Sequence, residues 1–174
     1  LELFKHRIPW LLLLMVSATF TGMIITHFEG VLSFSIALTA AIPMLMDTGG
    51  NCGSQSSVTV IRSLSLGELH FKDLFKVWWK EARVAVMCGV TLAAANFVKL
   101  LLIERVGVPI ALTICLTLCV TVFIAKMVGC TLPILADKLG FDPAVMASPF
   151  ITTIVDALAL LIYCGFAGMI LGLA

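Results

Sequence analysis

Long apolar segments make up most of the chain and restrict its possible folds more than any other feature. A helix needs about 20 mainly apolar residues to cross the roughly 30 Å hydrocarbon core of a bilayer. Only 12% of the 174 residues are charged, whereas soluble domains carry about 25%. We therefore expect an all-α integral membrane protein with five spans, at residues 8–26, 31–61, 82–103, 108–128 and 144–173.

The basic residues are unevenly distributed among the predicted connections. With the N-terminus in the cytoplasm, nine of the 11 fall on the cytoplasmic side, and only Lys99 and Arg105 fall outside. The nine are Lys5, Arg7, Arg62, Lys72, Lys76, Lys80, Arg83, Lys126 and Lys138. Because positive charge accumulates on cytoplasmic loops, we expect a multi-pass cell-membrane protein with a cytoplasmic N-terminus and an external C-terminus. Its surroundings are membrane lipid, and a net charge of +1 gives no reason to expect nucleic acid.

Asp156 lies within the fifth predicted span, which contains no lysine or arginine. Such a residue costs roughly 3 kcal/mol on insertion scales, so an intramembrane carboxylate is a functional-site hypothesis by default. Helical spacing places it on one face with Ser148, Thr152, Ala159 and Tyr163, which indicates the wall of a water-filled cavity. The alternative role is a hydrogen bond that holds two helices together, which Asn or Ser would provide at lower cost.

A second polar stretch, DTGGNCGSQSS, begins at Asp47 inside the second predicted span. Counted from Val31, Asp47 lies about 24 Å into the membrane at 1.5 Å per residue. Counted from Pro149 in the opposite direction, Asp156 lies about 10 Å in. We therefore expect both carboxylates at similar depth in the cytoplasmic half. Asn51 follows Asp47 on the same helix face, so the two helices should contribute to one polar lining.

The glycines of this stretch permit two backbone arrangements. Gly49 and Gly53 form a G-x-x-x-G motif, which allows another helix to approach closely. Gly49 and Gly50 together could instead break the helix, which is tolerated at membrane depth beside protein or water. The sequence leaves a continuous and a broken helix equally open.

Catalytic chemistry has little support in the sequence. The six cysteines include no C-x-x-C motif. Cys115 and Cys119 share a helix face and could hold a soft metal, but buried free cysteines commonly act as small apolar side chains. Asp47 and Asp156 could form an aspartyl dyad that shares a proton, yet neither has the tyrosine–aspartate or glycine-x-glycine–aspartate context of that chemistry. We expect a protein that is not an enzyme.

The polar faces offer oxygen donors, which favour the hard cations Mg²⁺ and Ca²⁺ over transition metals. Two carboxylates are too few for a dry, all-protein Ca²⁺ site, whereas Mg²⁺ dehydrates reluctantly and can be held through its own water. Five spans scarcely enclose a pore alone. A symmetric dimer, with the second and fifth helices of both chains around the two-fold axis, would double the carboxylates.

Three stretches, PMLMDTGGNCGSQSS, RSLSLGEL and FDPAVMASPFITTIVDALALLIY, resemble the transmembrane domain of the MgtE family of magnesium channels. The resemblance covers all five predicted spans. It implies a bacterial inner-membrane homodimer with five helices per subunit and a Mg²⁺-conducting pore lined by the second and fifth helices. It also implies that Asp156 is the central pore carboxylate, that the backbone carbonyl of Thr152 faces the hydrated ion, and that Ser148 is a polar pore position. The expected metal site is Asp156, Thr152, Ser148, Asp47 and Asn51.

The sequence also departs from the family pattern. Some members carry Asn in place of Ser148, so hydrogen bonding to the hydrated ion would differ here. Members typically carry a cytosolic N-terminal domain and a pair of CBS domains that sense Mg²⁺. Neither is recognisable in residues 1–174, which we expect to form a single transmembrane pore domain. An exchanger that couples divalent cations to Na⁺ or H⁺ is the alternative to a channel.

Overall fold

The computed structural model describes residues 2–144 and 148–172, and this part of the chain is helical, without a β-strand. Its elements are α1 (Glu2–His27), α2 (Glu29–Leu32), α3 (Ile36–Ser65), the short 3₁₀ turn η1 (Phe71–Asp73), α4 (Leu74–Leu102), α5 (Val108–Lys138) and α6 (Ser148–Leu171). The expected all-α class is therefore confirmed for the described residues.

Three described stretches are long and apolar enough to cross a membrane: Phe71–Leu102, Val108–Lys138 and Phe150–Leu171. They correspond to the third, fourth and fifth predicted spans, and they identify a membrane protein by length and composition. α1 adds a shorter apolar stretch, Leu11–His27. The fifth span was expected from residue 144, but its helix begins at Ser148, and residues 145–147 lie outside the described part.

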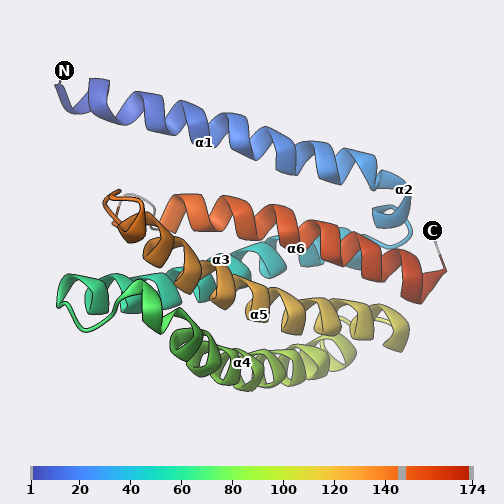
Figure 1. Cartoon of the computed structure of the whole chain (residues 1–174). Helices are drawn as coiled ribbons and strands as arrows, with labels where there is room; N and C mark the ends of the chain where they lie inside the picture. Colours follow the sequence, from blue (N-terminus) through green and yellow to red (C-terminus); the bar gives the residue numbers. More distant parts are fainter. Residues whose placement is uncertain (1, 145–147, 173–174) are drawn as a thin grey trace.

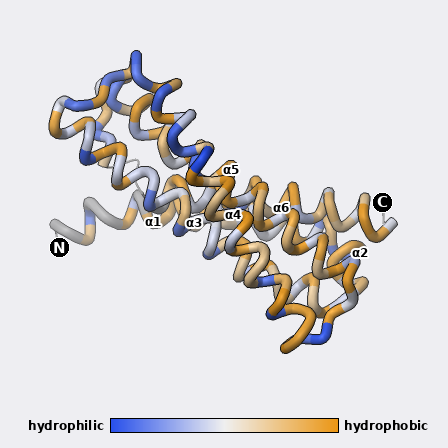
Figure 2. The backbone as a smooth tube through the Cα atoms, turned by 90° about the horizontal axis from the view of Figure 1, so that it is seen from below, coloured by the Kyte–Doolittle hydropathy of each residue, from blue (hydrophilic) through white to orange (hydrophobic). Residues whose placement is uncertain are grey.

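Successive long helices run in opposite directions along an elongated bundle, with the connections gathered at its two ends (Figure 1). α3 packs mainly against α5 and α6, α4 packs against α5, and α1 packs against α6. Hydrophilic residues are concentrated towards the ends of the bundle, and hydrophobic residues occupy much of the length between them (Figure 2). This distribution suits helices whose middle sections lie in hydrocarbon.

The second predicted span is interrupted near its start. A turn at residues 33–35 separates α2 from α3, which begins at Ile36 with Ser35 as its N-cap. The Ser35 hydroxyl accepts a hydrogen bond from a backbone amide of the first turn at 3.3 Å, which satisfies a donor that the helix leaves free. The expectation of an uninterrupted span from Val31 is therefore wrong. Asp47 lies 11 residues, or about 16 Å, along α3.

Beyond this turn, α3 is continuous. It runs through Gly49, Gly50 and Gly53 without a break, so the continuous arrangement is the correct one. α5 is also longer than expected, because the helix predicted at residues 108–128 extends to Lys138.

The structure removes Lys126 from the loop residues on which the predicted orientation depends. Lys126 is buried within α5, with only 5% of its surface exposed. A lysine enclosed by protein is not part of a loop, so it carries no information on topology. Without Lys126, eight basic residues are predicted on the cytoplasmic side against two outside, so the orientation stays a prediction on the same basis.

Glycine allows the backbones of α3 and α5 to touch. A Cβ atom added at Gly129 of α5 would collide with the backbone of Gly53 on α3. A Cβ added at Gly53 would lie 2.8 Å from a methyl carbon of Ile151 on α6 and 3.1 Å from the carbonyl oxygen of Ala125 on α5. The close approach expected from the G-x-x-x-G motif is therefore confirmed, and α3 is held between α5 and α6.

Two residues that were expected on the polar face of α6, Ala159 and Tyr163, belong to the core instead. Tyr163 is fully buried, and its hydroxyl donates a hydrogen bond of 2.9 Å to the backbone carbonyl of Leu38 in the first turn of α3. Ala159 is also buried, with 2% of its surface exposed. The predicted wall of a water-filled cavity therefore does not extend to these two residues. They pack α6 against α3 instead.

We expect Gly129→Ala to destabilise the protein by about 1 to 3 kcal/mol, because the added methyl group would separate α3 from α5. The unfolding midpoint in detergent, followed by fluorescence-detected size-exclusion chromatography, measures this effect. Gly22→Ala in α1 is the matched control, because no atom lies within 4 Å of the Cβ position there. Equal midpoints for the two variants would contradict the close α3–α5 contact.

Candidate cation site between α3 and α6

A small pocket of about 190 Å³ lies between the middle of α3 and the first half of α6. Six residues line it: Met46, Asp47, Gly50, Asn51, Thr152 and Asp156. Four of the five residues expected from the sequence as an ion site therefore meet in one place. The two carboxylates come from residues more than 100 positions apart, and they lie at the same level of the bundle.

α3 contributes Asp47 and Asn51 from its exposed face. They are one helical turn apart, so their side chains are neighbours. The Asn51 side-chain amide donates a hydrogen bond of 3.1 Å to Oδ2 of Asp47. This bond orients the carboxylate and leaves the Asn51 amide oxygen available as a further acceptor.

α6 contributes Thr152 and Asp156, which are half-buried and also one turn apart. Gly50 allows α3 to approach them, because a Cβ at Gly50 would lie 2.9 Å from the Thr152 methyl carbon. With Thr152 present, a larger residue at this position would push α6 away from α3. The glycine therefore controls the width of the pocket.

The charge of the pocket is negative. Asp47 and Asp156 contribute two carboxylates, and none of the lining residues is basic. Two like charges at one site repel each other, and a cation between them would relieve that repulsion. The donors are carboxylate, amide and hydroxyl oxygens, the ligand types that Mg²⁺ and Ca²⁺ prefer.

The chemistry of the donors favours a hydrated ion. Among the described residues, no group of three or more His, Cys, Asp or Glu side chains is close enough to hold a bare metal ion. Mg²⁺ usually keeps several of its waters and binds through one or two carboxylates. The pocket matches that mode of binding.

Two other polar positions have different outcomes. Ser148 is the first residue of α6, and its side chain lies outside the described part of the structure, so its predicted role stays a prediction. Gln55, which helical spacing also predicts on the face of Asp47 and Asn51, is exposed one turn beyond Asn51 on α3 and is not among the residues that line the pocket.

Sequence reasoning missed a buried polar cluster behind this pocket. Ser56 of α3, Glu81 of α4 and Lys126 of α5 are joined by hydrogen bonds in the interior. Lys126 is among the basic residues predicted on the cytoplasmic side, and Glu81 directly precedes the third predicted span, where the sequence pattern assigns it no role. The signal that could have found them is an acidic and a basic residue in adjacent helical segments.

Comparison with known proteins supplies independent information. Residues 42–166 match the family model MgtE, described as a divalent cation transporter. The chain is 36% identical over 175 residues to the magnesium transporter MgtE of Thermus thermophilus, covering 97% of this chain and 37% of that protein. The magnesium transporters MgtE of Bacillus subtilis and Enterococcus faecalis are 35% and 30% identical, over 93% and 95% of this chain. The chain spans just over a third of the length of each relative.

We expect Asp156→Asn and Asp47→Asn each to weaken binding of Mn²⁺, a paramagnetic probe for oxygen ligands, because each removes one of the two charges of the pocket. A carboxylate that acts through a bound water typically contributes roughly tenfold or more to metal affinity. Titration of the purified protein, followed by electron paramagnetic resonance, measures the dissociation constant. Asp137→Asn, at the exposed end of α5, is the control. Unchanged affinity in both pocket variants would show that the pocket is not the cation site.

Proposed function

The chain belongs to the MgtE family of divalent cation transporters, and we propose that it forms a channel-like pore for Mg²⁺ in which Asp156 holds the hydrated ion. The observation that carries the proposal is the pocket in which Asp156 meets Asp47 without a basic neighbour. A carboxylate inside a membrane protein needs a partner that offsets its charge. A passing cation can be that partner.

The proposed mechanism relies on water-mediated contacts. Mg²⁺ would keep its inner water shell, and Asp156 and Asp47 would accept hydrogen bonds from that water. Thr152 and Ser148 precede Asp156 by one and two turns of α6 and would offer backbone and side-chain oxygens along the path. A binding site built on outer-shell contacts holds the ion weakly enough for conduction. The membrane potential then drives entry, by about 4.6 kcal/mol for two charges at 100 mV.

A second copy of the chain would complete the pore. Asp47 and Asn51 lie on an exposed face of α3, so one chain forms only one wall. Ile36 and Val58 lie on the same face, 11 residues before and after Asp47, and are 90% and 64% exposed. Apolar residues on either side of a polar patch suit helix-to-helix packing in a membrane. A two-fold axis beside α3 and α6 would place a second pair of carboxylates opposite the first.

The proposal includes the membrane topology expected from the sequence. α1 and α3 would add two spans to the three that are long and apolar enough by themselves. Most described side chains of α1 are exposed in the single chain, as suits a helix that faces lipid. The N-terminus would lie in the cytoplasm and the C-terminus outside, in the cell membrane of a bacterium. The bound and transported ion is Mg²⁺, and the protein acts as a transporter and not as an enzyme.

In liposomes, we expect Asp156→Asn to reduce Mg²⁺ uptake by roughly tenfold or more, since it removes the charge that attracts the hydrated ion. A Mg²⁺-sensitive dye inside the vesicles measures the flux, and size-exclusion chromatography establishes that the variant is folded. Asp137→Asn, which also removes one carboxylate, is the control. Full uptake by Asp156→Asn would contradict the proposal.

The same protein in a planar bilayer distinguishes a channel from a coupled exchanger. A channel passes Mg²⁺ current without a gradient of Na⁺ or H⁺, because no second ion has to move. Mg²⁺ flux that depends strictly on such a gradient would instead support the exchanger.

We expect native mass spectrometry in mild detergent to show two copies of the chain per particle. Val58→Trp should increase the single-chain fraction, because a bulky ring on the exposed face of α3 would obstruct the partner. Val86→Trp on α4, where the valine is similarly exposed at 56%, should leave the dimer intact. A wild-type protein that is entirely single-chain would exclude the dimeric pore.

A further inference from the structure

Three helices meet at a buried cluster formed by Ser56 of α3, Glu81 of α4 and Lys126 of α5. Their exposed fractions are 2%, 9% and 5%. The Ser56 hydroxyl donates to Oε2 of Glu81 at 2.7 Å and accepts from Nζ of Lys126 at 3.2 Å. Nζ of Lys126 is 3.5 Å from the same Glu81 oxygen. The hydroxyl of α3 therefore bridges a carboxylate and an ammonium group that belong to two other helices.

This cluster is not explained as a simple source of stability. Buried ion pairs lose much of their attraction to desolvation, and apolar side chains of similar volume often give equal stability. The proposed ion path does not use the cluster either, because neither Glu81 nor Lys126 lines the pocket between α3 and α6. Its hydrogen bonds are directional, because they form only within narrow limits of distance and angle. They can therefore fix the orientation of the helices that carry them.

The hydrogen bonds of Ser56 affect the orientation of Asp47, because both residues lie on α3. Ser56 follows Asp47 by nine residues, which is about two and a half helical turns. The two side chains therefore point to opposite faces of α3. Ser56 is buried and Asp47 is exposed, in agreement with this count. A rotation of α3 that disengaged Ser56 would also turn Asp47 away from Asp156.

Near the middle of α3, three glycines reduce the side-chain packing that could fix the rotation of the helix. At Gly49, Gly50 and Gly53 the helix offers backbone in place of side chains to α5 and α6. Such surfaces allow close approach, but a glycine surface has no side chain to interlock with its neighbour. The bridging hydroxyl supplies a specific contact at the level where the glycine surface ends.

We propose that Ser56, Glu81 and Lys126 form a positioning cluster that sets the rotation of α3, so that Asp47 and Asn51 face Asp156. The inference rests on the proposed function only in assigning the ion to that face. The three residues act through α3 and do not contact the ion. Their role is to set the geometry of a binding site on the opposite side of the helix.

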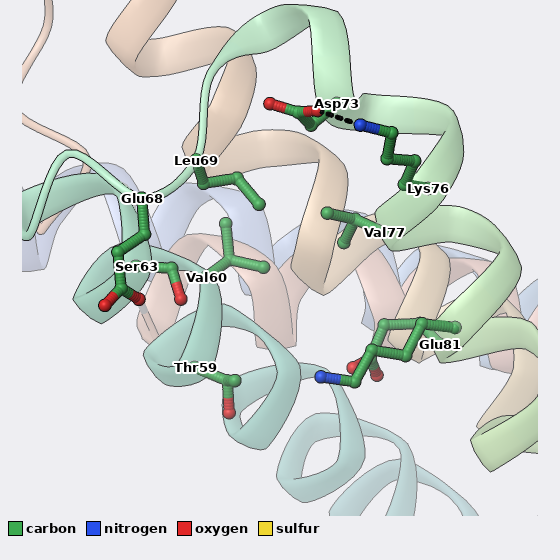
Figure 3. Close-up of a pocket in the computed structure, with 10 residues that line it drawn as sticks. Thr59, Val60, Ser63, Glu68, Leu69, Asp73, Lys76, Val77 and Glu81 are labelled. Atoms are coloured by element: carbon green, nitrogen blue, oxygen red, sulfur yellow. Dashed lines mark hydrogen bonds and ion pairs between the residues drawn. The ribbon is translucent and has the colours of Figure 1, made fainter.

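A solvent-accessible pocket of about 350 Å³ borders the cluster, and Glu81 is one of the residues that line it. Figure 3 shows Thr59 and Glu81 at one side of this pocket, with the Asp73–Lys76 ion pair at the other. Glu68 and Lys80 also line it, and both are exposed. They are a carboxylate and an amine outside the cluster, so they provide a matched control for Glu81 and Lys126.

The test uses a disulfide that reports on the rotation of α3. A Cβ at Gly50 would lie 3.6 Å from the Cβ of Thr152, within the 3.5–4.5 Å range of disulfides. Gly50→Cys combined with Thr152→Cys should therefore cross-link on mild oxidation, as measured by peptide mass spectrometry. Adding Glu81→Met and Lys126→Met should lower the yield at least several-fold, while the unfolding midpoint stays close to that of the parent.

Glu68→Gln with Lys80→Met, in the same cysteine background, should leave the yield unchanged. If the variant with both methionines fails to fold, Ser56→Ala takes its place, since it removes only the bridging hydroxyl. An unchanged yield in the folded methionine variant, or in Ser56→Ala where that replaces it, would overturn the positioning role. The cross-link needs no ion, so absence of Mg²⁺ flux in the wild-type protein would contradict the proposed function alone.

With Asp47, Asn51, Gly50 and Thr152 unaltered, the same cluster variants also separate positioning from stability in liposomes. We expect the Mg²⁺ concentration for half-maximal flux to rise several-fold in Glu81→Met with Lys126→Met, because the carboxylates of the pocket are turned apart. Glu81→Gln, whose amide oxygen still accepts from Ser56, should restore most of the affinity. Wild-type half-saturation in the methionine variant would contradict the inference.

Discussion

The contact between the backbones of α3 and α5 at Gly53 and Gly129 is the constraint on which the rest of the structure depends. In a membrane, lipid tails are as apolar as the side chains, so helices associate through close packing and not through loss of water. Glycine on both helices makes that packing possible. With α3 held against α5, its other small residues meet α6, and Asp47 reaches the level of Asp156.

The carboxylates within the apolar helices have two different environments. Glu81 is paired with Lys126 and bridged by Ser56, so its charge is compensated within the protein. Asp47 and Asp156 have each other for a neighbour and no basic residue in their pocket. The cluster with Glu81 and Lys126 lies at the buried face of α3, and the pocket with Asp47 and Asp156 lies at its exposed face.

Much of the fold follows from local pattern, and four of the five residues predicted from the sequence as an ion site line one pocket. Helical period relates Asp47 to Asn51 and Thr152 to Asp156 without knowledge of the tertiary structure. The start of α3 was misplaced because a short turn capped by Ser35 has no clear signature within a long apolar run. Tyr163 was assigned to a wet face because the spacing of residues gives a direction around the helix but not the identity of the neighbour.

The sequence by itself determined the helical class, the membrane environment and the face of each helix that carries the carboxylates, because these depend on hydropathy and periodicity within one segment. The tertiary structure decided that Lys126 is an interior residue, that Glu81 is its partner 45 positions away, and that Asp47 and Asp156 share one pocket. Such pairings depend on the rotation and depth of whole helices. Those quantities depend on contacts between segments far apart in the chain, such as the glycine contact of α3 with α5, which composition and spacing do not specify.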